Sequence, residues 1–530
     1  MIQIPAQDTS IAHTNTGGKG KVIIIGGGFG GLATAIRLQA AGHAITLVEA
    51  REHLGGRAYQ LKENGFTFDM GPTLITAPHL LENLWAAGGR SLRDDITLVP
   101  LSPFYRINFA DGRFFDYWGT SAADEAEIAR FEPRDVQGYR AFLADTQRMY
   151  ERAFADLAHQ PFLTLGSFLR VVPELVRFGA QRSVYSYVSR YFHSLHLRMV
   201  FSFHPLFIGG NPFRASSIYS IVPYLERLGG VHYAQGGMYT LIKAMEHLLC
   251  SLGGEVRCEM PVEQILLKER RVTGVRLADG TLLQADVVVA NSDVASTLLN
   301  LLPKSPTAHY PDLHPRRMKQ YRYSMSCFLL YLGINRRYEQ LRHHTIFMPE
   351  NYRKLIHAIF DGQSLPNDLA LYLHMPTRTD PSMAPPGGES LYVLAPVPNL
   401  AHGIDWARET PALRDRIIRF LEQKAGLEGL ESSIVTEQTF TPLDFESELR
   451  SHLGAAFSIE PTLTQSAYLR PHNRSSHVDG LYFVGAGTHP GAGIPGVLLS
   501  ADITSRLVME DLAKRQFHLL QHPSMSGADW

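Results

Sequence analysis

The sequence predicts an α/β protein, α+β overall, in which a discontinuous Rossmann-like domain is combined with a mixed β-sheet domain and a helical insertion. Three observations predict this class. A buried-type strand at 21–25 is followed at once by a glycine-rich turn and a helical pattern. A second buried-type strand, 286–291, comes only after a long helical stretch, and a third, 481–484, precedes another glycine-rich turn and helix. We therefore expect one parallel sheet assembled from distant parts of the chain.

The first glycine-rich turn has the form Gly26-x-Gly28-x-x-Gly31 and leads into a helix from Leu32. In such a turn the first glycine makes the tight bend, the second lets a pyrophosphate approach the backbone, and the third lets the helix pack closely on the strand. Glu49 ends the next predicted strand, where a carboxylate can accept hydrogen bonds from ribose hydroxyls. Because strand, turn, helix, second strand and terminal acid occur in the required order, an adenine dinucleotide site is predicted rather than a structural turn.

The remaining pattern suggests how the chain is divided. Alternating apolar residues predict strands near 100–118 and a hairpin at 265–284 that turns at Asp279-Gly280. Apolar strands at 327–333 and 390–395 and a helix near 411–425 follow. The expected organisation is a flexible leader (1–20), a dinucleotide-binding domain (21–100, 231–300 and 476–514), a substrate-binding domain (101–124 and 301–475), a helical subdomain (125–230) and a tail (515–530).

The helical subdomain has an unusual composition. Residues 161–225 hold thirteen aromatic residues, six arginines and one acid, Glu174. Two interpretations stay open: a subdomain that packs its apolar stripe into the core, or an interfacial helix with its apolar face toward acyl chains and its arginines toward anionic headgroups. The predicted apolar face consists of Phe162, Phe168, Val171, Val172, Leu175, Val176 and Phe178, with Arg170, Arg177 and Arg182 available for the other face.

Composition excludes several classes of protein. The 530 residues carry a net charge of −1, which argues against a nucleic-acid partner. Cys250, Cys258 and Cys327 form no zinc pattern and suggest a reducing compartment. His193-x-x-His196 has no further ligand at a matching spacing, so no metal site is predicted. The first twenty residues do not resemble a secretion signal, and no apolar run reaches about 18 residues, so we expect a cytoplasmic protein that associates peripherally with the membrane.

A family resemblance rests on motifs beyond the first turn. Gly55-Gly56-Arg57, soon after Glu49, resembles the flavoprotein superfamily that contains amine oxidases, GDP-dissociation inhibitors and carotenoid desaturases, which implies FAD rather than NAD. From Lys21 to Leu512 the chain is similar to the bacterial and fungal phytoene desaturases. The segments that carry this similarity are Phe68–Thr73, Phe457–Ser466 and Gly485–Gly496.

The resemblance implies an enzyme with non-covalent FAD that introduces double bonds into the C40 hydrocarbon phytoene, giving lycopene, neurosporene or a more desaturated product. An allylic carbon would lose hydride to the flavin while a base, or water held by the protein, removes the neighbouring proton. Quinone or oxygen is the expected electron acceptor. Because phytoene is wholly apolar, we expect the substrate to be taken from the bilayer.

The same resemblance suggests site residues. Glu460 and His489 are the candidates for the base, because both lie in segments that resemble flavin-facing ones. Gly491-x-Gly493-x-x-Gly496 matches the dinucleotide pattern again, but a turn with two prolines follows the strand and no terminal acid comes later, so we expect a helix end aimed at the flavin instead. The expected cofactor-binding residues are Gly26, Gly28, Gly30, Gly31, Glu49, Gly56, Arg57, Val262, Gly487, Ile494 and Val497.

Three alternatives remain open. An FAD amine oxidase would share the nucleotide module, although many attach flavin through a cysteine toward the C-terminus and no cysteine follows Cys327 here. A carotenoid isomerase or a hydroxycarotenoid desaturase is harder to exclude, and product analysis would separate these enzymes. A non-enzymatic carrier like the GDP-dissociation inhibitors is disfavoured, since such carriers have dropped flavin whereas this chain keeps Glu49, Arg57 and the glycine turn.

Overall fold

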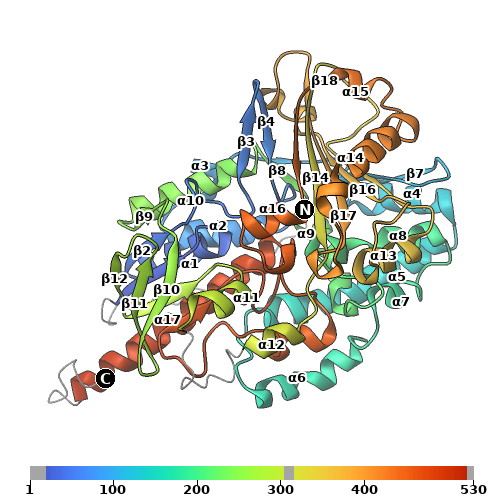
Figure 1. Ribbon diagram of the computed structural model, residues 1–530. Helices are drawn as coiled ribbons and strands as arrows, with labels where there is room; N and C mark the ends of the chain where they lie inside the picture. Colours follow the sequence, from blue (N-terminus) through green and yellow to red (C-terminus); the bar gives the residue numbers. More distant parts are fainter. Residues whose placement is uncertain (1–19, 304–314, 522–530) are drawn as a thin grey trace.

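Two β-sheets organise the chain in the computed structural model, which describes residues 20–303 and 315–521 (Figure 1). The first is a five-stranded sheet in the order β19-β13-β1-β2-β9, with every neighbouring pair parallel. Its strands come from three distant stretches: β1 (Lys21–Ile25), β2 (Ala44–Val48), β9 (Glu255–Arg257), β13 (Val287–Ala290) and β19 (Leu481–Phe483).

Alternate residues of β1 enter two different cores. Val22 and Ile24 pack in the core that also holds α1 (Phe29–Ala40), α10 (Met238–Ser251) and α17 (Ile494–Gln521). Ile23 and Ile25 pack in the core formed with a three-stranded antiparallel sheet. Burial on both faces explains why the strand is apolar without alternation. The strands of that smaller sheet are β10 (Val262–Lys268), β11 (Arg271–Leu277) and β12 (Leu282–Gln284).

The second large sheet has seven strands in the order β18-β14-β17-β16-β15-β6-β7. Neighbours are antiparallel except β15 and β6, which run parallel. On β14, Phe328, Leu330 and Leu332 share a core with α14 (Trp406–Gln423), while Leu329 and Tyr331 face the hairpin of β3 (Gln60–Glu63) and β4 (Phe66–Asp69). The strands are β6 (Tyr105–Asn108), β7 (Phe114–Tyr117), β14 (Ser326–Ile334), β15 (His344–Phe347), β16 (Leu371–His374), β17 (Glu389–Val397) and β18 (Ile434–Phe440).

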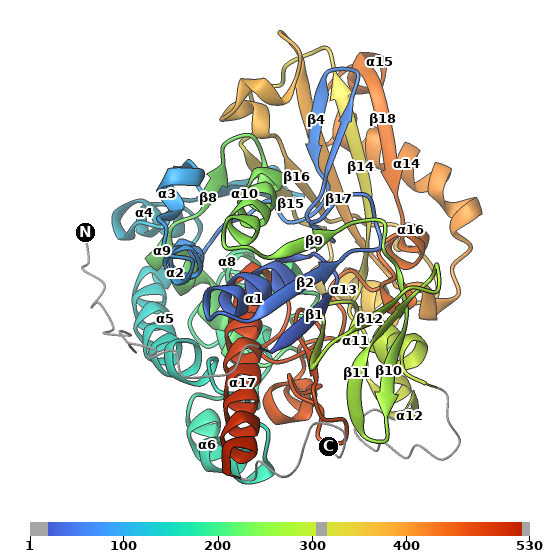
Figure 2. The same ribbon diagram turned by 90° about the vertical axis from the view of Figure 1, so that its left-hand side faces the viewer.

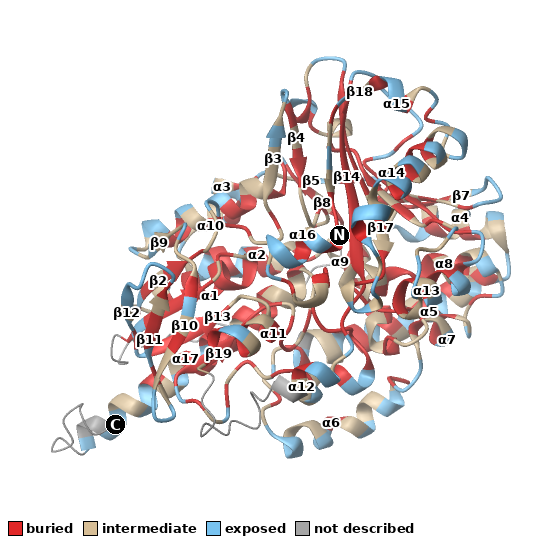
Figure 3. Ribbon diagram, in the orientation of Figure 1, coloured by how far each residue is buried: buried red, intermediate tan, exposed pale blue. Residues whose placement is uncertain are grey.

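Helices dominate between β7 and β8 (His232–Ala234), which pairs with β5 (Leu98–Pro100). Most of them pack in the core that contains α1 and α10. The exception is α6, which lies at the lower end of the molecule in Figures 1 and 2 and shows mostly intermediate and exposed residues in Figure 3. These helices are α4 (Ser121–Phe131), α5 (Asp135–Met149), η1 (Tyr150–Leu157), α6 (Leu165–Arg177), α7 (Val184–Val188), α8 (Leu195–Ser202) and α9 (Val222–Gly229).

The remaining α-helices are α2 (Pro78–Ala87), α3 (Leu92–Asp95), α11 (Val294–Ser296), α12 (Pro315–Gln320), α13 (Tyr352–Asp361), α15 (Leu430–Ser433) and α16 (Pro442–Ser447). Within the described residues, no helix combines the length and apolar character needed to cross a bilayer.

The structure confirms the predicted strand, turn, helix and strand at 21–48 and the turn at Asp279-Gly280, which joins β11 to β12. The helix predicted at 411–425 is α14, displaced toward the N-terminus by a few residues. The helix predicted after the second glycine-rich turn is α17, which includes residues 515–521 of the expected tail. The rest of that tail, 522–530, and residues 1–19 of the predicted leader lie outside the described residues.

Candidate active site

One cavity of about 950 Å³ is lined by residues from both large sheets and from the helical segment. One part of its wall is formed by the glycine-rich turn after β1, the ends of β2 and β13, and the turn before α17. The other part is almost wholly apolar. The two parts belong to the same space, so a bound dinucleotide and an apolar substrate would meet inside it.

Glycines of the turn after β1 line the cavity. Gly26 has φ +96, a conformation that favours glycine. A Cβ on Gly31 would lie 2.0 Å from the carbonyl oxygen of Gly26, so this residue allows the close packing of helix on strand. A Cβ on Gly28 would meet Asn291 Oδ1 at 3.0 Å and otherwise only Gly55 O at 4.0 Å. Gly28 and Gly30 line the cavity, and α1 has no side-chain cap on its first turn, which suits an anion.

Glu49 lies at the carboxyl end of β2 and is buried. Its Oε2 accepts a hydrogen bond from the Gly27 N–H at 2.8 Å, and its Oε1 accepts one from the Arg51 N–H at 3.0 Å. A carboxylate oxygen has a second lone pair, so both oxygens keep acceptor capacity toward the cavity, where ribose hydroxyls would donate.

Arg57 supplies a partly buried cation next to the same turn. Its Nη2 donates to Ser451 Oγ at 2.7 Å, whereas its Nε has no hydrogen-bond partner among the described residues. Burial lowers the pKa of Arg57 below its usual value, and the nearby Asp293 opposes this effect. A partly unpaired guanidinium in a cavity is the group that would bind a phosphate or another electron-rich part of a cofactor.

The remaining predicted cofactor residues divide into two groups. Gly56, Val262, Ile494 and Val497 line the cavity. Gly487 is absent from the lining, and a Cβ there would lie 2.5 Å from Val294 Cγ1, so the structure places it in packing.

Together these residues can accommodate FAD. The turn offers backbone N–H groups and room for a pyrophosphate, Glu49 offers acceptors for a ribose, and Arg57 offers an underused cation. The neighbouring apolar wall suits an isoalloxazine ring better than a polar nicotinamide amide.

The apolar part of the cavity is built from the helical segment and from the face of the seven-stranded sheet. Examples are Phe154, Phe203 and Ile221 on one side and Leu329 and Ile346 on the other. Close aromatic packing continues this wall, with the rings of Phe207 and Tyr372 centred 6.2 Å apart. Such a surface accommodates a hydrocarbon and offers it few polar contacts.

Glu226, on α9, is a buried acid in this apolar part of the wall. Its Oε2 accepts a hydrogen bond from the Tyr105 hydroxyl at 2.9 Å and lies 3.4 Å from His204 Nε2. Its Oε1 has no partner among the described residues. An unpaired buried carboxylate oxygen is costly.

The structure does not bring the two predicted base candidates together at the wall. Glu460 is 1% exposed and does not line the cavity. Its oxygens lie 3.3 Å from Arg214 and 3.5 Å from Arg322. Burial raises the pKa of Glu460, and the Arg214 guanidinium opposes that rise.

His489 does line the cavity, with its ring 5.3 Å from that of Phe162. Both ring nitrogens lack hydrogen-bond partners among the described residues, although the backbone of Gln160 lies near the ring. Burial, followed by repulsion from Arg470, lowers the pKa of His489 to about 3. The imidazole is therefore neutral and a weak base at physiological pH.

A third polar feature reaches the cavity from the seven-stranded sheet. The Tyr372 hydroxyl and Thr73 Oγ1, which both belong to cavity-lining residues, are 2.5 Å apart. The same hydroxyl lies 2.7 Å from Nδ1 of His344, a fully buried residue on β15. This chain of hydrogen bonds connects the cavity to a group of buried histidines.

The sequence analysis missed Asn291, Glu226 and Tyr372. Asn291 lines the cavity and donates to the Val484 carbonyl at 3.0 Å. It directly follows the buried strand β13, and a polar residue at the carboxyl end of such a strand is a signal for a ligand site. Glu226 is a single acid after the apolar stretch Ile221–Leu225, which is a weaker signal. Nothing in the local pattern distinguishes Tyr372.

Comparisons with known proteins agree with this geometry. The model of the family of flavin containing amine oxidoreductases matches residues 29–509. A lycopene-forming phytoene desaturase of Pseudescherichia vulneris is 50% identical over 93% of this chain and 99% of its own length. A neurosporene-forming phytoene desaturase of Rhodobacter capsulatus is 41% identical over 93% of this chain and 95% of its own length.

Solved structures show the same fold at low identity. A putrescine oxidase with redesigned cofactor binding has a TM-score of 0.62 at 14% identity, covering 94% of this chain and 99% of its own. A putative protoporphyrinogen oxidase from Exiguobacterium sp. 255-15 has a TM-score of 0.57 at 17% identity, covering 93% and 99%.

Proposed function

The chain belongs to the flavin-containing amine oxidoreductase family, and from that premise we propose that it is a phytoene desaturase that introduces double bonds into the C40 carotene phytoene to form lycopene or neurosporene. It is an oxidoreductase acting on CH–CH groups, and its cofactor is FAD. The observation that carries the proposal is one cavity with two kinds of wall. A dinucleotide cradle, formed by Gly26, Gly28, Gly30, Glu49 and Arg57, shares this space with a long apolar wall.

The cradle residues hold and orient the cofactor. The N–H groups at the start of α1 would face the pyrophosphate, Glu49 would accept from the ribose hydroxyls, and Arg57 would neutralise negative charge. When bound, FAD supplies the two-electron oxidant that desaturation requires. The start of α17, through Ile494 and Val497, places the positive end of a long helix dipole at the same cavity.

The apolar wall binds the substrate by excluding water. Each methylene group removed from water contributes about 0.8 kcal/mol, so a C40 hydrocarbon gains on the order of tens of kcal/mol inside such a cavity compared with free solution. The same arithmetic opposes release into water and favours direct exchange with a bilayer.

Three side chains are candidates for the proton acceptor: Glu226, Glu460 and His489. Loss of hydride leaves an electron-poor carbon chain whose neighbouring C–H bond is acidic, so a weak base is sufficient. Glu226 is supported by its free Oε1 in the apolar wall. His489 is supported by its place at the wall, whereas Glu460 is paired with two arginines and would have to act through other groups.

We place the membrane contact at α6 and the neighbouring segment 463–469. Leu165, Leu169 and Val176 of α6 are each more than half exposed, at 51%, 55% and 52%. Leu463 and Leu469 are 39% and 37% exposed. Phe168 and Leu175, on the same helix, line the cavity. This helix, for which the sequence left both a core-packing and an interfacial role open, therefore has one side toward the cavity and another toward solvent.

Two features support a lipid surface as the partner of this patch. The exposed Arg170 and Arg177 lie on the same helix and suit anionic headgroups. The stacked rings of Phe168 and Tyr468, 6.2 Å apart, connect α6 to the second apolar segment beside the cavity. In this arrangement phytoene moves between the bilayer and the flavin without crossing water, and a membrane quinone, or oxygen, accepts the electrons.

The alternatives differ in their support. The amine oxidase reading rests on fold likeness at 14% identity, whereas phytoene desaturases of both product types are 40–50% identical over nearly the whole chain. An isomerase would leave the number of double bonds unchanged, and a hydroxycarotenoid desaturase would not accept phytoene.

Expression in a host that accumulates phytoene tests the proposal. Extracted pigments with longer conjugation, identified by their absorption bands, are the expected result and also distinguish lycopene from neurosporene. Unchanged phytoene alongside a flavin-loaded purified protein would reject this substrate.

A further inference from the structure

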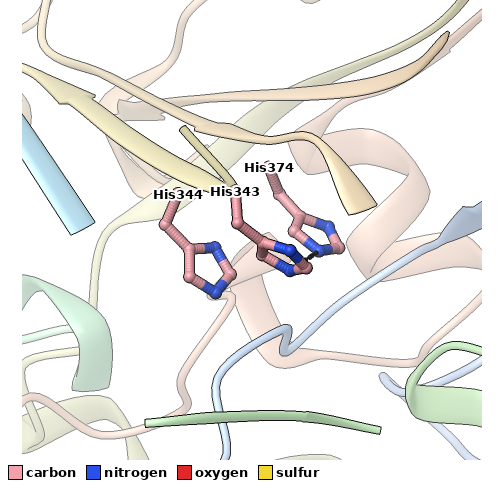
Figure 4. Close-up of side chains that lie close together, drawn as sticks. All are labelled: His343, His344 and His374. Atoms are coloured by element: carbon pink, nitrogen blue, oxygen red, sulfur yellow. Dashed lines mark hydrogen bonds between the residues drawn. The ribbon is translucent and has the colours of Figure 1, made fainter. Parts of the chain in front are cut away.

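Three buried histidines from neighbouring strands meet at one end of β15 and β16 (Figure 4). His344 and His374 are directly opposite each other in the register of these strands, and His343 precedes β15. Their side chains are 0%, 1% and 6% exposed in that order. One ring nitrogen from each lies within 4.8 Å of the other two.

The spacing of the rings matches that of imidazoles sharing one metal ion. A metal–nitrogen distance of about 2.0–2.1 Å gives nitrogens about 3.3 Å apart in a tetrahedral site, and His343 Nε2 lies 3.2 Å from His374 Nε2. The same geometry places ring centres roughly 5.2 Å apart, close to the largest of the observed spacings. The three observed centre-to-centre distances are 4.5, 4.9 and 5.1 Å.

The outer nitrogens of two rings already have partners of the kind that support metal ligands. His343 Nδ1 lies 2.7 Å from Thr379 Oγ1, and His344 Nδ1 lies 2.7 Å from the Tyr372 hydroxyl. Such contacts fix the ring orientation and leave Nε2 free to ligate. In His343 the nitrogen that remains, Nε2, faces His374.

Packing alone leaves one atom unexplained. A hydrogen bond between His343 and His374 satisfies one nitrogen of each, but His344 Nε2 is buried and has no hydrogen-bond partner among the described residues. An unpaired buried nitrogen is destabilising, and a metal bond would remove that cost. The carboxylate of Asp380, which accepts a hydrogen bond from the Gly236 N–H at 2.7 Å, acts electrostatically on His343 and would partly balance a buried cation.

We propose that His343, His344 and His374 bind one divalent late first-row metal ion, of the zinc type, through their Nε2 atoms. Three neutral imidazoles without a thiolate suit such an ion better than calcium or magnesium. The ion would join β15 to β16 and hold His344 with its proton on Nδ1. His344 would then donate to the Tyr372 hydroxyl, which would donate in turn to Thr73 at the cavity wall. The three histidines lie outside the flavin cradle, and metal binding there does not depend on the proposed substrate.

Metal analysis of the holoenzyme tests the site. The full chain, purified without a histidine tag and with its flavin bound, is incubated with Zn²⁺, freed of loose metal by gel filtration and measured by inductively coupled plasma mass spectrometry. Wild type is expected to retain one more zinc per chain than His374→Ala or His343→Gln. The matched control His193→Ala, which alters a solvent-exposed histidine, is expected to equal wild type.

X-ray absorption at the zinc edge of the wild-type protein gives a readout that does not need a variant to fold. Scattering from about three imidazoles is expected. Retention of no zinc by wild type, equal zinc in wild type and a folded cluster variant, or an edge spectrum without imidazole ligands would each overturn the proposal.

Discussion

The hydroxyl of Tyr372 lies 2.7 Å from Nδ1 of His344 and so joins the cavity wall to the buried histidine cluster. Replacing Tyr372 by Phe removes this contact and the 2.5 Å contact with Thr73. Because partners buried in the protein are left unpaired, the free energy of unfolding is expected to fall by about 1–3 kcal/mol. Urea unfolding of the flavin-loaded protein measures the change.

Tyr331→Phe is the matched control for that variant. Tyr331 is fully buried nearby, but its hydroxyl has no hydrogen-bond partner among the described residues, so its removal is expected to be neutral or slightly stabilising. Equal losses in the two variants would mean that the Tyr372 hydrogen bonds contribute nothing specific.

Alanine substitutions at Gly31 and Gly28 are predicted to affect different properties, the stability of the fold and the affinity for FAD. In Gly31→Ala the new methyl group would lie 2.0 Å from the Gly26 carbonyl oxygen, so the fold itself should be destabilised. In Gly28→Ala the methyl group would lie at the cavity lining, 3.0 Å from Asn291 Oδ1, so the protein should fold but bind FAD at least about tenfold more weakly, a loss of about 1.4 kcal/mol. Flavin titration followed by fluorescence, together with unfolding curves, separates the two effects. Normal FAD affinity in Gly28→Ala would show that the pyrophosphate does not approach this residue.

Glu226→Gln tests the proton acceptor. If Oε1 accepts the proton, kcat should fall by about 10²–10⁴-fold while flavin content and unfolding stay close to wild type. Glu460→Gln is expected to act mainly on stability, because it weakens the pairing with Arg214 and Arg322. Steady-state desaturation with phytoene in vesicles measures kcat. Full activity of Glu226→Gln together with a large loss in His489→Ala would transfer the role to His489.

Acid stability should depend on His489. Burial lowers the pKa of this side chain from 6.5 to about 3, so between these values the unfolded chain binds the proton and the folded chain does not. Stability from this group is therefore lost as pH falls below 6.5, by about 1.4 kcal/mol per pH unit once well below that value. His489→Gln should lose about 1.5 kcal/mol less than wild type between pH 6.5 and pH 5. Parallel pH profiles of urea unfolding for the two proteins would contradict the assignment.

Introducing negative charges on the apolar face of α6 tests the membrane patch. Leu165→Asp with Leu169→Asp should weaken binding to anionic vesicles by roughly tenfold or more per residue, since each leucine contributes about 1.5 kcal/mol or more when it enters the interface. Leu282→Asp is the control, because Leu282 is 62% exposed but lies on β12, away from α6. Vesicle sedimentation gives the affinities. Equal weakening in the control would show that α6 has no special role.

The parts of the fold that were predictable are those fixed by local pattern. Val22 to Ile25 form an apolar run because both faces of β1 are covered, and Gly31 is required where a helix crosses a strand at contact distance. Both constraints act on neighbouring residues, so the sequence displays them directly.

The missed features depend on contacts between distant segments. His344 and His374 meet only because β15 pairs with β16 in one register. The positions of the histidines in the sequence do not indicate this register. Glu460 and Glu226 show the same limit. The segment around Glu460 resembles a flavin-facing one, but the charges that surround this acid come from Arg214 and Arg322, far away in the chain.

The most direct test of the central claim is an anaerobic mixing experiment with the flavin-loaded protein and vesicles that contain phytoene. We expect the visible absorption of oxidised flavin to disappear while a carotene with longer conjugation appears, with one flavin reduced for each double bond formed. New pigment without flavin reduction, or flavin that stays oxidised beside unchanged phytoene, would contradict it.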